Sequence, residues 1–158
     1  MIVASEVGAR KAMRRRLGQY QLTFQTPAKR LPEFAGLILR GDRPVRSAQL
    51  LIVQVVFRPL ENLEALLADH ELPVDLASGT SLFAETPDES LALLAAALGD
   101  WMDFYFLPSP KRFLLFADHD EYTTLFAHRK APLSRISGHL AAAGFEEVTG
   151  YVRQTDEM

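Results

Sequence analysis

The sequence predicts an α+β fold in a single domain over residues 1–158, with an antiparallel or mixed sheet of about five to six strands and about three to five helices, mostly on one face. Residues 112–128 hold two aromatic-rich runs of strand length on either side of a charged tetrapeptide, the pattern of a β-hairpin. Residues 49–57 are rich in β-branched side chains, which favours a buried strand. Two other segments, 59–70 and 86–98, repeat leucine at helical spacing. The chain therefore combines β-strands with α-helices.

The N-terminal part pairs a basic segment with a strand. Residues 1–18 are predicted as a basic helix or extension, because small and apolar residues follow helical spacing among several arginines. Met13 leaves open a translation start at that position. Residues 20–25 alternate bulky apolar side chains with glutamine and threonine, the period of a strand with one solvent-exposed face. Residues 32–40 fit a helix or a strand, and residues 41–44 read as a loop.

The middle of the chain supplies the strand that we place centrally in the sheet. The run 49–57 has an unbroken apolar face, and only Gln54 interrupts its other face, so both faces are expected to be at least partly covered. A helix then follows from Pro59 to about His70. The interval 72–85 is predicted to be rich in loops.

The next helix has the best-defined ends in the sequence. Thr86 is a suitable N-cap, Pro87 occupies the first helical position, and Glu89 completes a capping box. Gly99 is predicted to end this helix as the C′ glycine.

The C-terminal half continues the sheet. Residues 101–107 have strand character and precede the hairpin. A last helix is predicted to open at Pro132 and to close at Gly144, and a final strand is predicted over about 147–153. Three strands in succession, followed by a helix, indicate a meander with helices gathered on one side of the sheet.

Composition narrows the class of protein. Hydrophobic residues make up 48% and charged residues 23%, which is average for a globular domain. Because the chain has no cysteine, it can form no disulfide, no thiolate nucleophile and no cysteine-ligated metal site. No apolar run reaches the roughly 18 residues of a membrane span, and no signal-peptide pattern opens the chain. We therefore expect a cytoplasmic protein that has no membrane partner.

The tetrapeptide Asp118, His119, Asp120 and Glu121 places an imidazole among three carboxylates. Such a cluster could bind a divalent metal or supply an acid and a base. It matches neither an EF-hand loop nor a helical zinc motif. The alternative is structural, since aspartate at the first position of a turn bonds its own backbone and charges keep a loop tip in water.

A second candidate is a surface for a ligand or a partner. On the predicted strand 101–107, Trp101, Asp103 and Tyr105 share one face, and Tyr122 follows on the hairpin. Flat aromatic rings with a charge among them are common at interfaces. The alternative is that Asp103 is simply solvated near the start of the strand.

The basic N-terminal cluster is a third candidate, for contact with nucleic acid. It lacks interleaved aromatic residues that would stack on bases, and the whole chain carries a net charge of -3. A solvated helix face explains the same pattern, so we regard nucleic acid as an unfavoured partner.

Together these patterns predict a non-catalytic module that binds another protein or itself, with no cofactor. No nucleophile elbow, phosphate-binding loop or dinucleotide fingerprint occurs in the sequence. A homodimer is expected through the open sheet face around Trp101, Tyr105 and Tyr122, because both faces of the hairpin carry large apolar side chains. Two alternatives remain open. One is a small enzyme or ligand-binding protein with an acidic, metal-binding pocket near residues 118–121, and the other is a regulator associated with nucleic acid.

Overall fold

The computed structural model describes residues 1–73 and 75–158, and it confirms the α+β class. Within these residues the strands form one antiparallel sheet of seven, in the order β1-β4-β3-β5-β6-β7-β2. The strands are β1 (Ile2–Ser5), β2 (Tyr20–Gln25), β3 (Ser47–Gln54), β4 (Thr80–Ala84), β5 (Asp103–Ser109), β6 (Leu114–Ala117) and β7 (Tyr122–Ala127). The helices are α1 (Ala9–Arg14), α2 (Leu31–Arg40), α3 (Glu61–Asp69), α4 (Pro87–Gly99) and α5 (Lys130–Ala142). A 3₁₀ turn, η1 (Thr155–Glu157), lies near the C-terminus.

The sheet exceeds the predicted strand number because two short strands at its edge carry little pattern. β4 lies inside the interval that was expected to be loop, and β1 lies in the predicted basic extension. β1 pairs with β4, and β4 pairs with β3. Strands of four and five residues complete too few alternations to be recognised in a sequence. β3 lies between β4 and β5, in agreement with its predicted central position.

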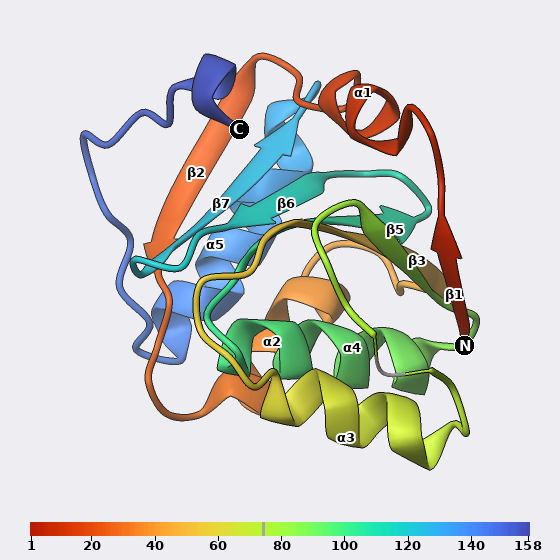
Figure 1. Cartoon of the computed structure of the whole chain (residues 1–158). Helices are drawn as coiled ribbons and strands as arrows, with labels where there is room; N and C mark the ends of the chain where they lie inside the picture. Colours follow the sequence, from red (N-terminus) through yellow and green to blue (C-terminus); the bar gives the residue numbers. More distant parts are fainter. Residues whose placement is uncertain (74) are drawn as a thin grey trace.

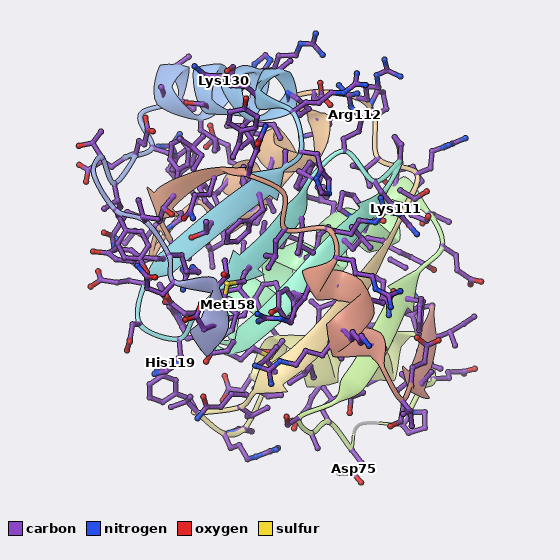
Figure 2. The ribbon with its side chains drawn as sticks, turned by 90° about the horizontal axis from the view of Figure 1, so that it is seen from above. Asp75, Lys111, Arg112, His119, Lys130 and Met158 are labelled. Carbon is purple, nitrogen blue, oxygen red and sulfur yellow. The ribbon has the colours of Figure 1, made fainter. Side chains whose placement is uncertain are left out.

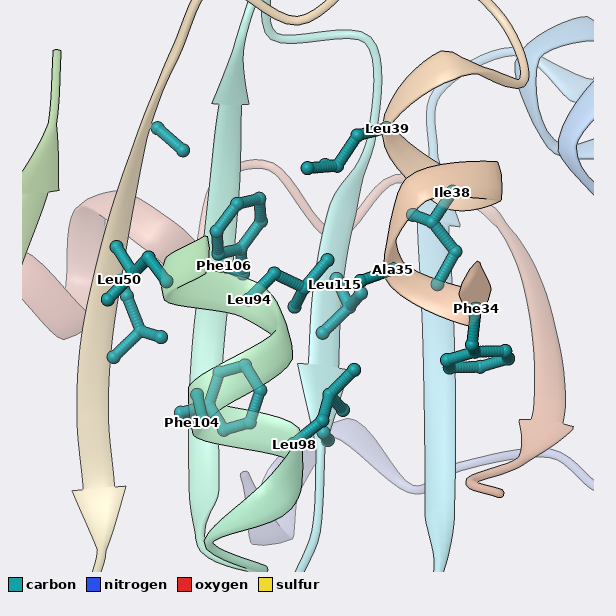
Figure 3. Close-up of a cluster of buried hydrophobic side chains, with 14 of the residues drawn as sticks. Phe34, Ala35, Ile38, Leu39, Leu50, Leu94, Leu98, Phe104, Phe106 and Leu115 are labelled. Atoms are coloured by element: carbon teal, nitrogen blue, oxygen red, sulfur yellow. The ribbon is translucent and has the colours of Figure 1, made fainter. Parts of the chain in front are cut away.

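Helices α2 to α5 cover one face of the sheet, and the main core lies beneath them (Figure 1). The ambiguous segment 32–40 forms α2, an amphipathic helix that buries Phe34 and Ile38. α4 packs on β3, β4 and β5 through Leu94 and other leucines, against Phe104 and Phe106 of β5 (Figure 3). Burial of these large side chains supplies the main driving force for folding.

The opposite face is also covered, which differs from the expected open surface. Met13 of α1 and Met158 pack on Tyr105, Phe116 and other residues of β3 and β5 to β7 in a second, smaller core. Figure 2 looks onto this face, with α1 and the C-terminal turn in front of the strands. α1 is shorter than predicted, and its Arg14 donates a 2.8 Å hydrogen bond to the carbonyl of Met158.

The predicted final strand over 147–153 does not form. Glu147 makes an isolated bridge to Phe24 of β2, and the N–H of Val148 donates to the carbonyl of Thr23 at 2.8 Å. Gly150 then takes a left-handed φ of 77°, which ends the extended conformation. The chain consequently leaves the edge of the sheet and crosses its face.

This crossing covers the face of β2 that was expected to be exposed to solvent, and it leaves Thr23 on that face buried. The guanidinium of Arg153 is buried and donates to the hydroxyl of Thr124 at 2.8 Å and to the carboxylate of Asp118 at 2.9 Å. The hydroxyl of Thr124 also lies 2.8 Å from that of Thr23. Polar residues on β2 are thus satisfied by the C-terminal segment in place of water.

The start of α4 agrees with its prediction, but its end does not. The hydroxyl of Thr86 accepts the N–H of Glu89 at 3.1 Å, as an N-cap should. Gly99 is still helical, and the residue with left-handed φ is Trp101, at 50°. Trp101 therefore occupies a position where glycine or asparagine is usual.

Candidate binding site around Trp101

Three connections meet at the end of the sheet where β5 begins, and they line an open hollow of about 500 Å³. The connection from β3 and the first turn of α3 contribute Phe57, Pro59, Glu61 and Asn62, the turn from α4 to β5 contributes Gly99, Asp100 and Trp101, and the hairpin contributes His119. We call this space the Trp101 hollow.

Asp100 fixes one wall of the Trp101 hollow. Its buried carboxylate accepts the backbone N–H groups of Asn62 and Leu63 at 3.0 and 2.9 Å, and the side-chain amide of Asn62 at 2.8 Å. The carboxylate thereby satisfies two backbone donors in the first turn of α3, where a negative charge also complements the helix dipole. Because Asp100 immediately precedes Trp101, the end of α4 and the start of α3 hold the tryptophan in place.

His119 forms the facing wall, between two carboxylates. Its Nδ1 lies 2.8 Å from Oδ1 of Asp103, and its Nε2 lies 3.3 Å from Oδ1 of Asp120. The hydrogen bond to Asp103 raises the pKa of His119 above its ordinary value. Partial burial lowers this pKa, and the negative charges of Asp103 and Asp120 raise it further. The imidazolium form is therefore favoured at this position.

Asp118 builds the hairpin turn and faces away from the hollow. Its Oδ1 accepts the backbone N–H groups of Asp120, Glu121 and Tyr122 at 3.0, 2.9 and 3.0 Å, and its Oδ2 binds Arg153. Burial opposes ionisation, but the backbone donors and Arg153 outweigh it and lower the pKa of Asp118. This is the structural role that the sequence offered as an alternative to metal binding.

The predicted metal residues do not converge. Asp118 is bound within the turn, Glu121 accepts a hydrogen bond from Gln25, and His119 pairs with Asp103 and Asp120. Across residues 1–73 and 75–158, no three histidine, aspartate or glutamate side chains are placed to hold one metal ion.

The four residues of the predicted partner surface are separated as well. Trp101 lines the hollow, and Asp103 contacts it only through His119. Tyr105 is fully buried under α1 and cannot reach a partner. Tyr122 packs edge to face on Tyr151, with ring centroids 4.8 Å apart. The expected homodimer face is thus not an exposed surface of the folded chain.

Phe57, Glu61, Asn62 and Asp100 are among the site residues that sequence reasoning missed. Phe57 was assigned to the strand 49–57, but β3 ends at Gln54, so Val56 and Phe57 lie in the following connection with 39% and 56% of their surfaces exposed. The signal available in the sequence was Pro59, which cannot donate to a sheet and marks the region as a connection.

A second hollow of about 540 Å³ adjoins the first between α2, α3 and α4. Asn62, Gly99 and Trp101 line both spaces. Its floor is formed by small residues of α4, among them Ala92, Ala95 and Ala96. The two hollows therefore adjoin at these residues, and we call them together the concave surface around Trp101.

Comparison of the chain with models of known protein families, with functionally characterised proteins and with solved structures finds no match. None of the helices in the described part of the chain has the length and apolar character needed to cross a membrane.

Proposed function

We propose that this protein is a non-catalytic binding module that docks another protein at the concave surface around Trp101. The observation that carries the proposal is the backbone of Trp101. A bulky residue with a φ of 50° is strained, at a cost of about 1–3 kcal/mol, and such strain gathers at functional positions. The backbone conformation by itself favours glycine here, so the indole stands at this position against the local backbone preference.

The rim of the surface supports docking of a protein. Val56 and Phe57 are consecutive, exposed and apolar, and Phe57 borders the Trp101 hollow. Buried aromatic anchors in the centre of an interface contribute most of its binding energy. An exposed phenylalanine beside a half-buried tryptophan has the composition of such an anchor.

The chemistry of the lining supports a non-catalytic role. Both nitrogens of His119 face carboxylates, so its proton is already shared within the protein. The described lining of the Trp101 hollow includes no serine, threonine, cysteine or lysine that could serve as a nucleophile. The absence of cysteine from the sequence fits action in the reducing cytoplasm.

A second copy of the chain is the alternative occupant, since every copy carries the same exposed Val56 and Phe57. Sedimentation velocity across a concentration series separates the two cases. A heterologous partner predicts a monomer at all concentrations, whereas self-docking predicts concentration-dependent association that Phe57→Ser abolishes.

Site-specific photocrosslinking in the native cell tests the proposal. A benzophenone amino acid at position 57 is expected to capture one defined protein, and Trp101→Gly in the same chain is expected to abolish the capture. The matched control is a benzophenone at Tyr20, an exposed aromatic position that pairs with Ala127 at the end of β7 remote from the hairpin turn. Equal capture at positions 20 and 57, or capture that Trp101→Gly leaves intact, would refute docking at this surface.

A further inference from the structure

Acidic side chains outnumber the one basic side chain, His119, in the described lining of the concave surface around Trp101. Glu61 and Asp100 line the Trp101 hollow and Asp69 lines the adjoining hollow, and the described lining of the two includes no lysine or arginine. Among the ion pairs of the described residues, none involves Glu61 or Asp69. Both side chains are exposed, so their charges are available to a partner.

Neither His119 nor Arg58 places an uncompensated cation on this lining. His119 is flanked by Asp103 and Asp120, so that cluster retains an excess of negative charge even when the imidazole is protonated. Arg58 follows Phe57, but its guanidinium donates to the carbonyl of Leu76 at 3.0 Å and does not line either hollow.

From this charge and the aromatic rings beside it, we infer that the occupant is an arginine- or lysine-containing segment of another protein, an inference that rests on the docking function proposed above. The faces of Trp101 and Phe57 attract a cation through their π-systems, and a carboxylate beside them completes the recognition of a guanidinium or ammonium group. Glu61 supplies that carboxylate on the lining that it shares with the rings, and Asp69 extends the acidic lining along α3.

A basic segment is also present in this chain. Arg10 and Lys11 of α1 and Arg15 at its C-terminal end are exposed, and α1 packs on the sheet face opposite α3 and α4. Insertion of α1 from one copy into the hollow of another would build a ring or an open chain, or would need a reciprocal pair of contacts in a dimer. We take the basic segment to belong to a different protein, and self-association in the sedimentation series would contradict that choice.

The fluorescence of Trp101, the only tryptophan in the chain, tests this inference directly. The probes are three blocked pentapeptides, Gly-Arg-Gly-Arg-Gly, Gly-Glu-Gly-Glu-Gly and Gly-Leu-Gly-Leu-Gly, titrated into the full-length chain. The arginine peptide is expected to give a saturable change that weakens as salt is raised, because the charges involved are exposed to solvent. The glutamate and leucine peptides are expected to give none.

Matched variants separate local contact from net charge. Glu61→Gln with Asp69→Asn is expected to weaken binding of the arginine peptide by about two- to thirtyfold, the equivalent of two exposed ion pairs. The control, Glu64→Gln with Glu71→Gln, removes the same charge from α3 and from the second residue after its end, outside both hollows. It is expected to change the affinity less than twofold, roughly the effect of a screened distant charge.

Three results would overturn the inference. Equal weakening by the two double variants would show that net charge, and not the hollow, attracts the peptide. A fluorescence change with the glutamate or leucine peptide but not with the arginine peptide would contradict a basic partner and would still support docking at this surface. If no peptide changes the fluorescence, the basic partner is rejected, and capture at position 57 decides the docking function separately.

Discussion

Asp103 accepts two hydrogen bonds from His119 on a single oxygen, one from the backbone N–H at 2.7 Å and one from ring Nδ1 at 2.8 Å. The pair joins the first residue of β5 to the turn between β6 and β7. Because Asp120 lies 3.3 Å from the other ring nitrogen, the imidazole is held between two strand connections. The wall of the Trp101 hollow is therefore fixed by an ion pair whose strength depends on pH.

This ion pair predicts a pH-dependent stability. The pKa of His119 is raised in the folded chain, so its contribution is fully present below the ordinary histidine pKa of 6.5 and is lost as pH rises through the raised value. Urea unfolding of the wild type and of His119→Asn from about pH 5 to about pH 9 measures the contribution. The difference in free energy of unfolding between the two chains is expected to shrink as pH rises. A constant difference would mean that the imidazole does not gain a proton on folding.

The hairpin turn predicts that two neighbouring aspartates differ sharply in importance. Asp118→Ala removes three acceptor contacts to backbone N–H groups and leaves the buried guanidinium of Arg153 without its carboxylate. Breaking a buried pair in this way costs about 3–5 kcal/mol. Asp120→Ala, in the same turn, removes an 80% exposed side chain and is expected to cost less than about 0.5 kcal/mol. Urea unfolding at neutral pH gives both values, and comparable losses would contradict the structural role of Asp118.

Tyr105 carries an unpaired polar atom in the second core. Its hydroxyl is the one buried side-chain nitrogen or oxygen that lacks a hydrogen-bond partner in the described chain, and its ring packs edge to face on Phe116 at 5.0 Å. Burial of a hydroxyl without a partner costs about 1–3 kcal/mol. Tyr105→Phe keeps the ring and removes this cost, so it is expected to raise the free energy of unfolding by about 1 kcal/mol. Tyr20→Phe, at an exposed position, serves as the control and is expected to be neutral; a destabilised Tyr105→Phe chain would reveal a partner for the hydroxyl.

The sequence was sufficient for the fold class because long periodic segments determine it. The leucines of α4 and the N-cap at Thr86 are local signals, and the structure confirms both. The burial of Tyr105 was not predictable, since it depends on α1 and Met158, which come from opposite ends of the chain. The site was missed for a similar reason: Phe57, Trp101 and His119 are far apart in sequence, and only the sheet order brings their connections together.

Trp101 tests whether a bulky residue is held at this position at a cost in backbone strain. With φ at 50°, its backbone suits glycine, whereas an alanine at the same position retains the strain of a Cβ. Trp101→Gly and Trp101→Ala both remove the half-buried indole, so their difference isolates the backbone. Trp101→Gly is expected to be more stable than Trp101→Ala by about 1 kcal/mol.

The comparison with wild type completes this prediction. Relief of backbone strain offsets part of the packing energy that the indole provides. We therefore expect Trp101→Gly to lower the free energy of unfolding by less than about 1 kcal/mol. Phe104→Ala in the main core is expected to lower it by about 3–5 kcal/mol. Urea unfolding followed by circular dichroism measures all the chains, because the glycine and alanine variants lack the only tryptophan. A loss as large as that of Phe104→Ala, or an alanine variant as stable as the glycine variant, would make Trp101 a core residue and remove the argument for docking that rests on its strain.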